Sequence, residues 1–288
     1  MSDSNSTLSN IPEANFGYNP NEAAAITIGV LYLVLFLALS LRLYLSRSWW
    51  GLCLPIGVAA FSSGFFLRQA SVVNADNLGI FVASQFFIIV SPATFLAFNY
   101  IIYGRMMRTF AGDRPQYSLI RPRFVSTIFV ISDFFTFVLQ GAAAGLSSND
   151  DPSATNLARI LLKIGLILQL VSYIFFVIIV IHSHRCLLND KSYGVGNFPW
   201  ILIYLLYFSS VFIVIRGAYR IAEQENSTDD HLSFLLSHEV FFYLLDTLPL
   251  FLATVIYVPF WPGNILKRDN GNLNSTVSLT PLSQNQEP

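Results

Sequence analysis

Long apolar stretches separated by short polar segments dominate this chain. A helix needs roughly 20 mostly apolar residues to cross the ~30 Å hydrocarbon core of a bilayer, because every backbone N–H and C=O must be satisfied within its own segment there. Seven stretches meet this requirement, and we predict helices at 22–45, 50–73, 78–103, 124–146, 158–181, 198–219 and 238–258. The pattern therefore predicts an all-α integral membrane protein, a seven-transmembrane helix bundle.

The two ends of the chain are polar. Residues 1–21 lack the basic stretch and apolar core of a cleaved signal peptide, so we expect helix 22–45 to act as its own signal anchor. Residues 264–288 are rich in Asn, Ser, Thr, Gln and Pro and offer little to bury, which predicts a disordered tail. We expect an extracellular tail (1–21), a membrane domain (22–263) and a cytoplasmic tail (264–288).

The basic residues indicate how the bundle is oriented. Of the 16 Lys and Arg residues, 11 fall in alternate connections and in the C-terminal tail. By the positive-inside rule this predicts an N-terminus outside and a C-terminus in the cytoplasm. The glycosylation sequons at Asn5 and Asn226 then lie outside, whereas the sequon at Asn274 lies inside. No retention motif is visible, so we expect a plasma-membrane location, with another endomembrane as the alternative.

Composition excludes several classes of protein. Residues are 54% hydrophobic and only 11% charged, against roughly a quarter charged in soluble domains, so a water-soluble protein is excluded. No basic face is present for nucleic-acid binding. The two cysteines and four histidines show no metal-site spacing, no Walker A pattern occurs, and the last predicted helix has no lysine for retinal. We expect no enzyme activity, no cofactor and no metal.

Ionisable residues at membrane depth are the candidate functional residues, because an unpaired charge there costs several kcal/mol. Asp133 and Asp246 lie roughly 12 to 14 Å from their helix starts at 1.5 Å per residue. The other candidates lie nearer the outer surface: Arg68, Arg216, Arg220, Glu223 and Glu239. Helical spacing places 216, 220 and 223 on one face, and 239 and 246 on another. We predict that Arg216 or Arg220 pairs with Glu239, while Asp246 faces the interior beside the third or fourth helix.

Each of these residues also has a purely structural interpretation. Buried ion pairs can fix helix register without contacting a substrate. The amides Gln85, Asn99, Gln140 and Gln169 are either interhelical hydrogen-bonding groups or a polar lining for a headgroup path. Pro92 and Pro249 are expected to kink their helices. The small residues of 141–145 are expected to let another helix approach closely.

A set of ordered motifs resembles the fungal lipid-translocating exporters, also called RTA-like proteins. The similarity runs from about Tyr18 to Gly263. It rests on these elements: Tyr18-x-Pro20; Gly64 and Arg68; Pro92, Ala97, Tyr100, Gly104 and Arg105; Asp133 with Gln140-Gly141; Gly165-Leu166 with Gln169; Arg216, Arg220, Glu223, His238-Glu239, Tyr243 and Asp246; and Pro262-Gly263. The chain departs from the family pattern at Phe61, where an acidic residue is common, and at Phe65, where a tyrosine is common.

The resemblance implies a seven-helix plasma-membrane protein that moves amphipathic lipids such as sphingoid long-chain bases and confers tolerance to toxic amphiphiles. In that hypothesis the polar cluster lines a path for a charged headgroup, while the hydrocarbon tails stay in the bilayer. Asp133, Glu239 and Asp246 would be the partners of an ammonium group. The alternative is a seven-helix receptor or sensor for an amphipathic ligand, since bundle shape and orientation fit both.

Overall fold

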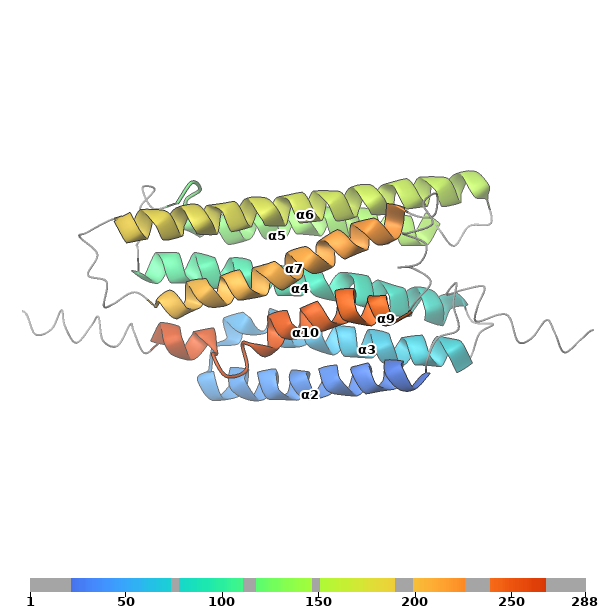
Figure 1. Cartoon of the computed structure of the whole chain (residues 1–288), viewed down its shortest axis with the longest axis horizontal. Helices are drawn as coiled ribbons and strands as arrows, with labels where there is room; N and C mark the ends of the chain where they lie inside the picture. The colour runs from blue at the N-terminus through green and yellow to red at the C-terminus, as the bar shows by residue number, and fades with distance from the viewer. Residues whose placement is uncertain are drawn as a thin grey trace, which may run out of the picture.

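A computed structural model describes residues 22–73, 78–110, 118–146, 151–189, 199–225 and 239–267, and all regular elements within these ranges are helical. The helices lie roughly parallel in an elongated bundle (Figure 1). In chain order the elements are α2 (Glu22–Ser46), η1 (Trp49–Gly51), α3 (Cys53–Val73), α4 (Leu78–Phe110), α5 (Pro122–Leu146), α6 (Pro152–Asn189), α7 (Trp200–Glu225), α9 (Glu239–Phe242), the π-helical turn η3 (Tyr243–Thr247) and α10 (Leu248–Val255).

Six helices are long and apolar enough to cross a membrane, whereas the last apolar stretch, Val240–Val255, is shorter. Several helices continue beyond the apolar windows used to predict them. Helix α4 runs on to Phe110, α7 to Glu225, and α6 extends at both ends to 38 residues. At 1.5 Å per residue α6 is about 57 Å long, well beyond the ~30 Å of a hydrocarbon core. Hydropathy locates the apolar part of a helix, but helical hydrogen bonding continues into the polar flanking turns.

Asp151 is the N-cap residue of α6 and begins the sequence Asp-Pro-Ser. The Asp151 carboxylate accepts hydrogen bonds from the Ser153 backbone N–H (3.1 Å) and hydroxyl (2.7 Å). Pro152 follows at the first helical position, where its missing N–H leaves no hydrogen bond unmade. The bonds from Ser153 lower the pKa of the Asp151 carboxyl, which lies outside the apolar span.

Consecutive helices pack side by side, and α4 also contacts α6 and α7, which makes it the central helix of the bundle. The last segment packs on α7 and returns to the first helix, where the Tyr32 hydroxyl donates to the Thr247 carbonyl (2.7 Å). Residues 22, 73, 78, 146, 152, 225 and 239 gather at one end of the bundle, called here the Glu22 end. The opposite end, which holds residues 46, 53, 110, 122, 189 and 200, is called the Ser46 end.

The sides of the bundle are apolar and exposed. In the most apolar stretch of α4, 56% is buried inside the bundle, whereas only 28% of the corresponding stretch is buried in each of α2, α5 and α6. Large apolar side chains such as Val34, Leu37, Phe134, Phe135 and Val171 point outward. A water-soluble monomer rarely exposes such a continuous apolar surface, so these helices present it to lipid.

The close helix contacts lie at glycines other than those predicted. On α3, a Cβ at Gly64 would stand 2.8 Å from Ile88 Cγ1 of α4, and on α6 a Cβ at Gly165 would stand 2.9 Å from Gln140 Cγ of α5. Among the described residues, a Cβ on Gly141 or Gly145 would meet no atom within 4 Å. The prediction that residues 141–145 allow a close helix approach is therefore wrong. Ala143 and Ala144 instead leave room for a cavity.

The segment after α10 is ordered further than predicted. Residues 262–267 form a helical turn, which includes the first residues of the segment expected to be a disordered tail. Trp261 anchors it, because its indole N–H donates to Ser48 Oγ (2.7 Å) and its ring is buried. Residues 268–288 and 1–21 lie outside the described residues.

Candidate functional site

A π-helical turn positions the most deeply buried carboxylate among the described residues. Asp246 lies within η3, three residues before Pro249 of α10. Proline has no N–H to donate and clashes with the preceding turn of an α-helix, and a π turn is one way for the backbone to accommodate it. Asp246 is 0% exposed. Such turns are rare and are often found at functional sites.

Two arginines of α7 hold this carboxylate. Arg220 binds it at two points, with Nε 2.6 Å from Oδ1 and Nη2 3.1 Å from Oδ2. Arg216, one turn earlier, places its Nε 3.1 Å from the same Oδ1. Arg220 also donates from Nη1 to Glu223 Oε2 (2.9 Å). These four residues form the charged cluster, whose two guanidinium groups and two carboxylates balance formally.

A shared aromatic ring connects Arg68 to the charged cluster. The Arg220 guanidinium carbon lies 5.4 Å from the centre of the Phe242 ring, and that of Arg68 lies 4.9 Å from the same ring. Arg68 and Phe242 are both buried. Cation–π contacts of this kind gain strength when they are desolvated. Phe242 was not among the predicted site residues, although its position four residues before Asp246 places it one helical turn away.

A cavity of about 300 Å³, called here the entrance cavity, opens at the Glu22 end between α4, α5, α6 and α7. Its polar walls include Gln85, Thr155, Arg159, Arg220 and Glu223, and its opposite wall is formed by Ala143 and Ala144. Arg220 also lines a smaller cavity, deeper in the bundle, together with Pro92, Gln169, Tyr173 and Arg216. The charged cluster therefore stands between the entrance cavity and the bundle centre.

Asp133 is a second buried carboxylate, and it lacks a cation. Its Oδ2 accepts a hydrogen bond from the Tyr100 hydroxyl (2.9 Å), and in the described part of the chain its Oδ1 has no hydrogen-bond partner and no basic side chain forms an ion pair with it. Tyr100 packs against Tyr173, with ring centres 6.0 Å apart. Tyr173 in turn lines the deeper cavity, so a short aromatic path connects Asp133 with that space.

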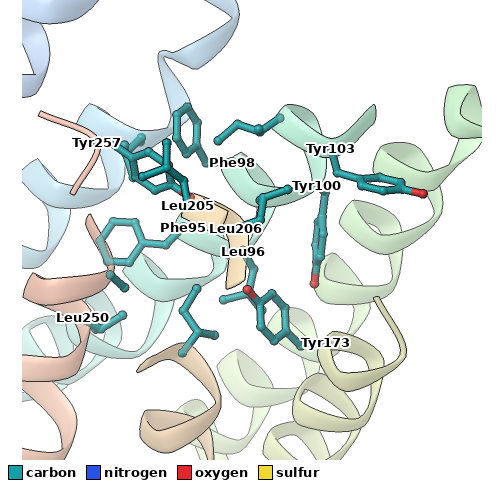
Figure 2. Close-up of a cluster of buried hydrophobic side chains, with 14 of the residues drawn as sticks. Phe95, Leu96, Phe98, Tyr100, Tyr103, Tyr173, Leu205, Leu206, Leu250 and Tyr257 are labelled. Carbon is teal, nitrogen blue, oxygen red and sulfur yellow. The ribbon is translucent and has the colours of Figure 1, made fainter. Parts of the chain in front are cut away.

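Asn99 of α4 joins four segments of the bundle. Its side-chain N–H₂ donates to Tyr173 OH (2.9 Å) and Ser209 Oγ (3.1 Å), and its carbonyl oxygen accepts from Tyr257 OH (2.8 Å). Figure 2 shows Tyr173 reaching toward the apolar side chains around Leu96 and Leu206. The Tyr103 hydroxyl points the other way, where it bonds to Ser118 and Ser183.

Gln140 and Gln169 bond to each other between helices. Gln140 Nε2 of α5 donates to Gln169 Oε1 of α6 (3.0 Å), beside the close approach at Gly165. Gln169 also lines the deeper cavity and Gln85 lines the entrance cavity. Gln140 thus connects two helices, whereas Gln85 and Gln169 have surfaces facing open space.

The predicted site residues fall into a charged group, a group on α5 and α6, and residues whose side chains lie outside the described part of the chain. Arg68, Arg216, Arg220, Glu223 and Asp246 come together at one level, whereas Asp133, Gln140 and Gln169 lie on α5 and α6. The predicted partner of the arginines was Glu239, but both arginines contact Asp246, and the side chain of Glu239 lies outside the described residues. Asn5 and Asn226 also lie outside them. Asp246 faces the interior, but it was expected beside the third or fourth helix, whereas the arginines that bind it are on α7.

Sequence reasoning missed four aromatic residues of the site, Tyr32, Tyr173, Phe242 and Tyr257. Aromatic residues are so frequent in this chain, at 15%, that none stands out in the sequence. Among the described residues, no group of three or more His, Cys, Asp or Glu is arranged to hold a metal ion.

The fold and the site define a multi-pass helical membrane protein with a buried charged cluster. Residues 54–269 match the family described as RTA1 like protein, and the chain belongs to that family. This confirms the resemblance to the fungal lipid-translocating exporters.

Several curated fungal proteins are similar to the chain. It is 27% identical over 205 residues to Protein RTM1 of Saccharomyces cerevisiae, covering 68% of this chain and 62% of that protein. It is 29% identical over 200 residues to protoporphyrin uptake protein 1 of the same species, covering 67% and 62%. It is 22% identical over 303 residues to the sphingoid long-chain base transporter RSB1 of Saccharomyces cerevisiae, covering 92% and 76%. The chain thus spans about three fifths of the length of the first two relatives. No solved structure matches the chain.

Proposed function

We propose that this protein moves amphipathic lipids across the membrane, with the polar headgroup passing through the entrance cavity and the hydrocarbon tails remaining in the bilayer. One observation carries the proposal: Arg220 lines both the entrance cavity and the deeper cavity, and it belongs to the charged cluster, in which the two arginines and Asp246 are buried and Glu223 is partly exposed. Charged groups within a span mark substrate and ion pathways, because their cost must be offset by pairing or by a wet cavity.

The proposed topology has seven spans, with the Glu22 end outside and the Ser46 end in the cytoplasm. The helix ends and connections at the Ser46 end carry Arg42, Arg47, Arg105, Arg108, Arg121, Arg123, Arg185 and Lys267. All four tryptophans of the chain belong to the same end, as expected for an interfacial aromatic belt: Trp49 and Trp50 lie in η1, Trp200 begins α7, and Trp261 bonds to Ser48. Under this topology the stretch through α9, η3 and α10 is the seventh span, and the entrance cavity faces outward. The plasma membrane is the proposed location.

The cargo class follows from the charges along the path. The walls of the entrance cavity carry Arg159 and Arg220 beside Glu223, a mixture that accommodates headgroups of either sign. The names of two relatives, a sphingoid long-chain base transporter and a protoporphyrin uptake protein, both refer to amphipathic molecules. We therefore propose an amphiphile with a charged headgroup, and a sphingoid long-chain base as the first cargo to test.

Asp133 is the proposed partner of an ammonium headgroup. Asp246 was the other candidate within the described residues, but two guanidinium groups already occupy its oxygens. Asp133 has one oxygen bound by Tyr100 and one oxygen open. A buried carboxylate without a cation can take up either an ammonium group or a proton. The sequence has no nucleotide-binding motif, so the proposed movement is either passive or coupled to protons at this carboxylate.

The test is reconstitution of the purified full chain into lipid vesicles with a fluorescent long-chain base, followed by chemical quenching of the outer leaflet. We expect faster loss of fluorescence than in vesicles without protein. Ala143→Leu fills the entrance cavity and should slow movement, whereas Ala142→Leu, the same change at an exposed neighbour, should not. Binding of the base without movement would overturn transport and favour a sensor.

A second test uses cells. Deleting the gene in its host should reduce release of long-chain bases and lower tolerance to phytosphingosine. Unchanged release and tolerance, together with retained movement of other lipids in vesicles, would remove this cargo and leave transport of another amphiphile.

A further inference from the structure

An apolar groove of about 350 Å³ runs between α2 and the η3–α10 segment and shares no lining residue with the entrance cavity. Its lining includes Leu31 and Tyr32 of α2 and Leu244, Thr247, Leu248 and Phe251 of the last segment. Leu31, Leu244 and Leu248 are each between 42% and 50% exposed and form the rim. The groove therefore opens sideways, toward the lipid that surrounds the bundle.

A buried hydroxyl lies under the otherwise apolar floor of this groove. Thr247 is 4% exposed, and its Oγ1 has no hydrogen-bond partner among the described residues. Tyr32 is fully buried and donates its hydroxyl to the Thr247 carbonyl (2.7 Å), so that carbonyl is already satisfied. A buried hydroxyl without a partner is costly, and in a native protein such a group calls for an explanation. Here the open hydroxyl belongs to a residue that lines the groove.

The charged cluster lies directly behind this floor. Asp246 precedes Thr247 in the π-helical turn, and Tyr32 lies close enough to Asp246 and Arg216 to interact electrostatically with both. Tyr32 and Thr247 thus separate an apolar groove from a group of buried charges. An amphiphile has the same two parts, an apolar chain joined to a polar head.

We propose that this groove holds the single hydrocarbon chain of the transported amphiphile, with the Thr247 hydroxyl bonding to a polar group where the chain joins the headgroup. The inference rests on the proposed function and adds the place of the chain. The groove is near the lower end of the 300–1,000 Å³ range of ligand pockets, which suits one chain rather than a two-chain phospholipid. The lipid-facing surface of α5, at Phe134 and Phe135, is apolar and offers no comparable hydroxyl.

The experiment uses the full chain in lipid nanodiscs and a long-chain amino alcohol with a diazirine in its chain. After illumination, mass spectrometry maps the labelled residues. We expect labelling to concentrate on residues 28–32 and 244–251. Leu248→Trp fills the groove and should reduce labelling about fivefold or more. Phe135→Trp, a large aromatic residue on the lipid-facing side of α5, should leave groove labelling unchanged.

Thr247 provides a test that does not depend on filling the groove. Thr247→Val keeps the shape and removes the hydroxyl, so groove labelling by the amino alcohol should fall, whereas Thr247→Ser should retain it. A diazirine-bearing alkane, which has no polar group, should label the wild type and Thr247→Val equally. If Leu248→Trp does not fold, Leu31→Trp fills the groove from the α2 side.

The outcomes separate this inference from the proposed function. Labelling as dense on α5 as in the groove would show ordinary surrounding lipid and overturn the inference. Lipid movement in vesicles without groove labelling would also overturn it and leave the proposed function standing. Groove labelling without lipid movement would support the chain site and overturn transport.

Discussion

Arg220 of α7 and Asp246 of the π-helical turn form a two-point ion pair inside the bundle, with Nε–Oδ1 and Nη2–Oδ2 separations of 2.6 and 3.1 Å. The planar guanidinium matches the carboxylate in a way that a lysine ammonium cannot. Because Asp246 is fully buried, removing either partner leaves a charge without its main compensation. The pair holds the last segment against α7. In the proposed function it also determines how deep in the bundle a headgroup would reach the charged cluster.

The first prediction concerns the stability of this pair. Arg220→Met and Asp246→Leu should each lower the free energy of unfolding by about 3 to 5 kcal/mol, because each leaves a buried charge without its main partner. The double substitution should cost less than the sum of the single ones by about 1 to 3 kcal/mol. Unfolding in detergent, followed by circular dichroism, measures all three.

Arg220→Lys is the matched control for geometry. It keeps the positive charge but loses the fork that binds both carboxylate oxygens, so its stability should fall between that of the wild type and that of Arg220→Met. Strictly additive costs in the Arg220–Asp246 cycle would contradict a direct interaction between the two side chains.

The level of the arginines could be predicted from the sequence, but their contact with Asp246 could not. Counting residues along α7 and the last helix places 216–223 and 238–243 at similar depth and Asp246 deeper, and this follows from helix rise alone. Which carboxylate faces the arginines depends on rotation about the helix axis. The sequence argument placed 239 and 246 on one face by assuming a continuous 3.6-residue period, and the π-helical turn at Tyr243–Thr247 interrupts that period. Pro249 indicates a disturbed helix but does not specify its form.

The second prediction concerns Asn99. Asn99→Leu removes three interhelical hydrogen bonds and should lower stability by about 2 kcal/mol, at roughly 0.6 kcal/mol for each bond within a membrane. Tyr257→Phe removes one of them and should cost about 0.6 kcal/mol. Tyr204→Phe, at an exposed tyrosine on α7, serves as the control and should leave the unfolding midpoint unchanged.

Equal costs for Asn99→Leu and Tyr257→Phe would show that Asn99 does not act as the centre of the network. The importance of this residue was only partly predictable. An amide inside an apolar helix predicts a hydrogen bond to another helix, but the partners Tyr173, Ser209 and Tyr257 lie 74 or more positions away in the sequence. Side chains so far apart in the chain are brought together only by the packing of the whole bundle.

The third prediction contrasts two glycines. A Cβ at Gly64 would lie 2.8 Å from Ile88 Cγ1 and 3.2 Å from the Ile88 backbone nitrogen, so Gly64→Ala must push α3 away from α4. Overpacking of this kind should cost about 1 to 3 kcal/mol. Gly141→Ala has open space in the described structure and should raise stability by up to about 1 kcal/mol through helix propensity. Thermal unfolding in detergent distinguishes the two, and a destabilising Gly141→Ala would indicate a helix contact at 141–145.

The sequence alone could not separate these two glycines. Both lie in apolar helices, and small residues in a run such as 141–145 are typical of helix–helix contacts. The difference is that Gly64 faces α4, whereas Ala143 and Ala144 border the entrance cavity. Small residues create close contact where a helix approaches and empty volume where none does.

The last prediction concerns Asp133 and the charge of the headgroup. Asp133→Asn is nearly isosteric, and its side-chain oxygen can still accept the hydrogen bond from Tyr100, so the protein should fold. The substitution removes the one described carboxylate of the inner bundle that has no cation. Loss of a charge-assisted hydrogen bond, at about 1.5 to 3 kcal/mol, should slow movement of an ammonium-bearing long-chain base by about tenfold or more in vesicles. A fluorescent lipid with a neutral headgroup should move at the wild-type rate in the same vesicles, because it gains nothing from the carboxylate. Equal slowing of both lipids would mean that Asp133 only supports the fold, and equal wild-type rates for both would remove it from the path.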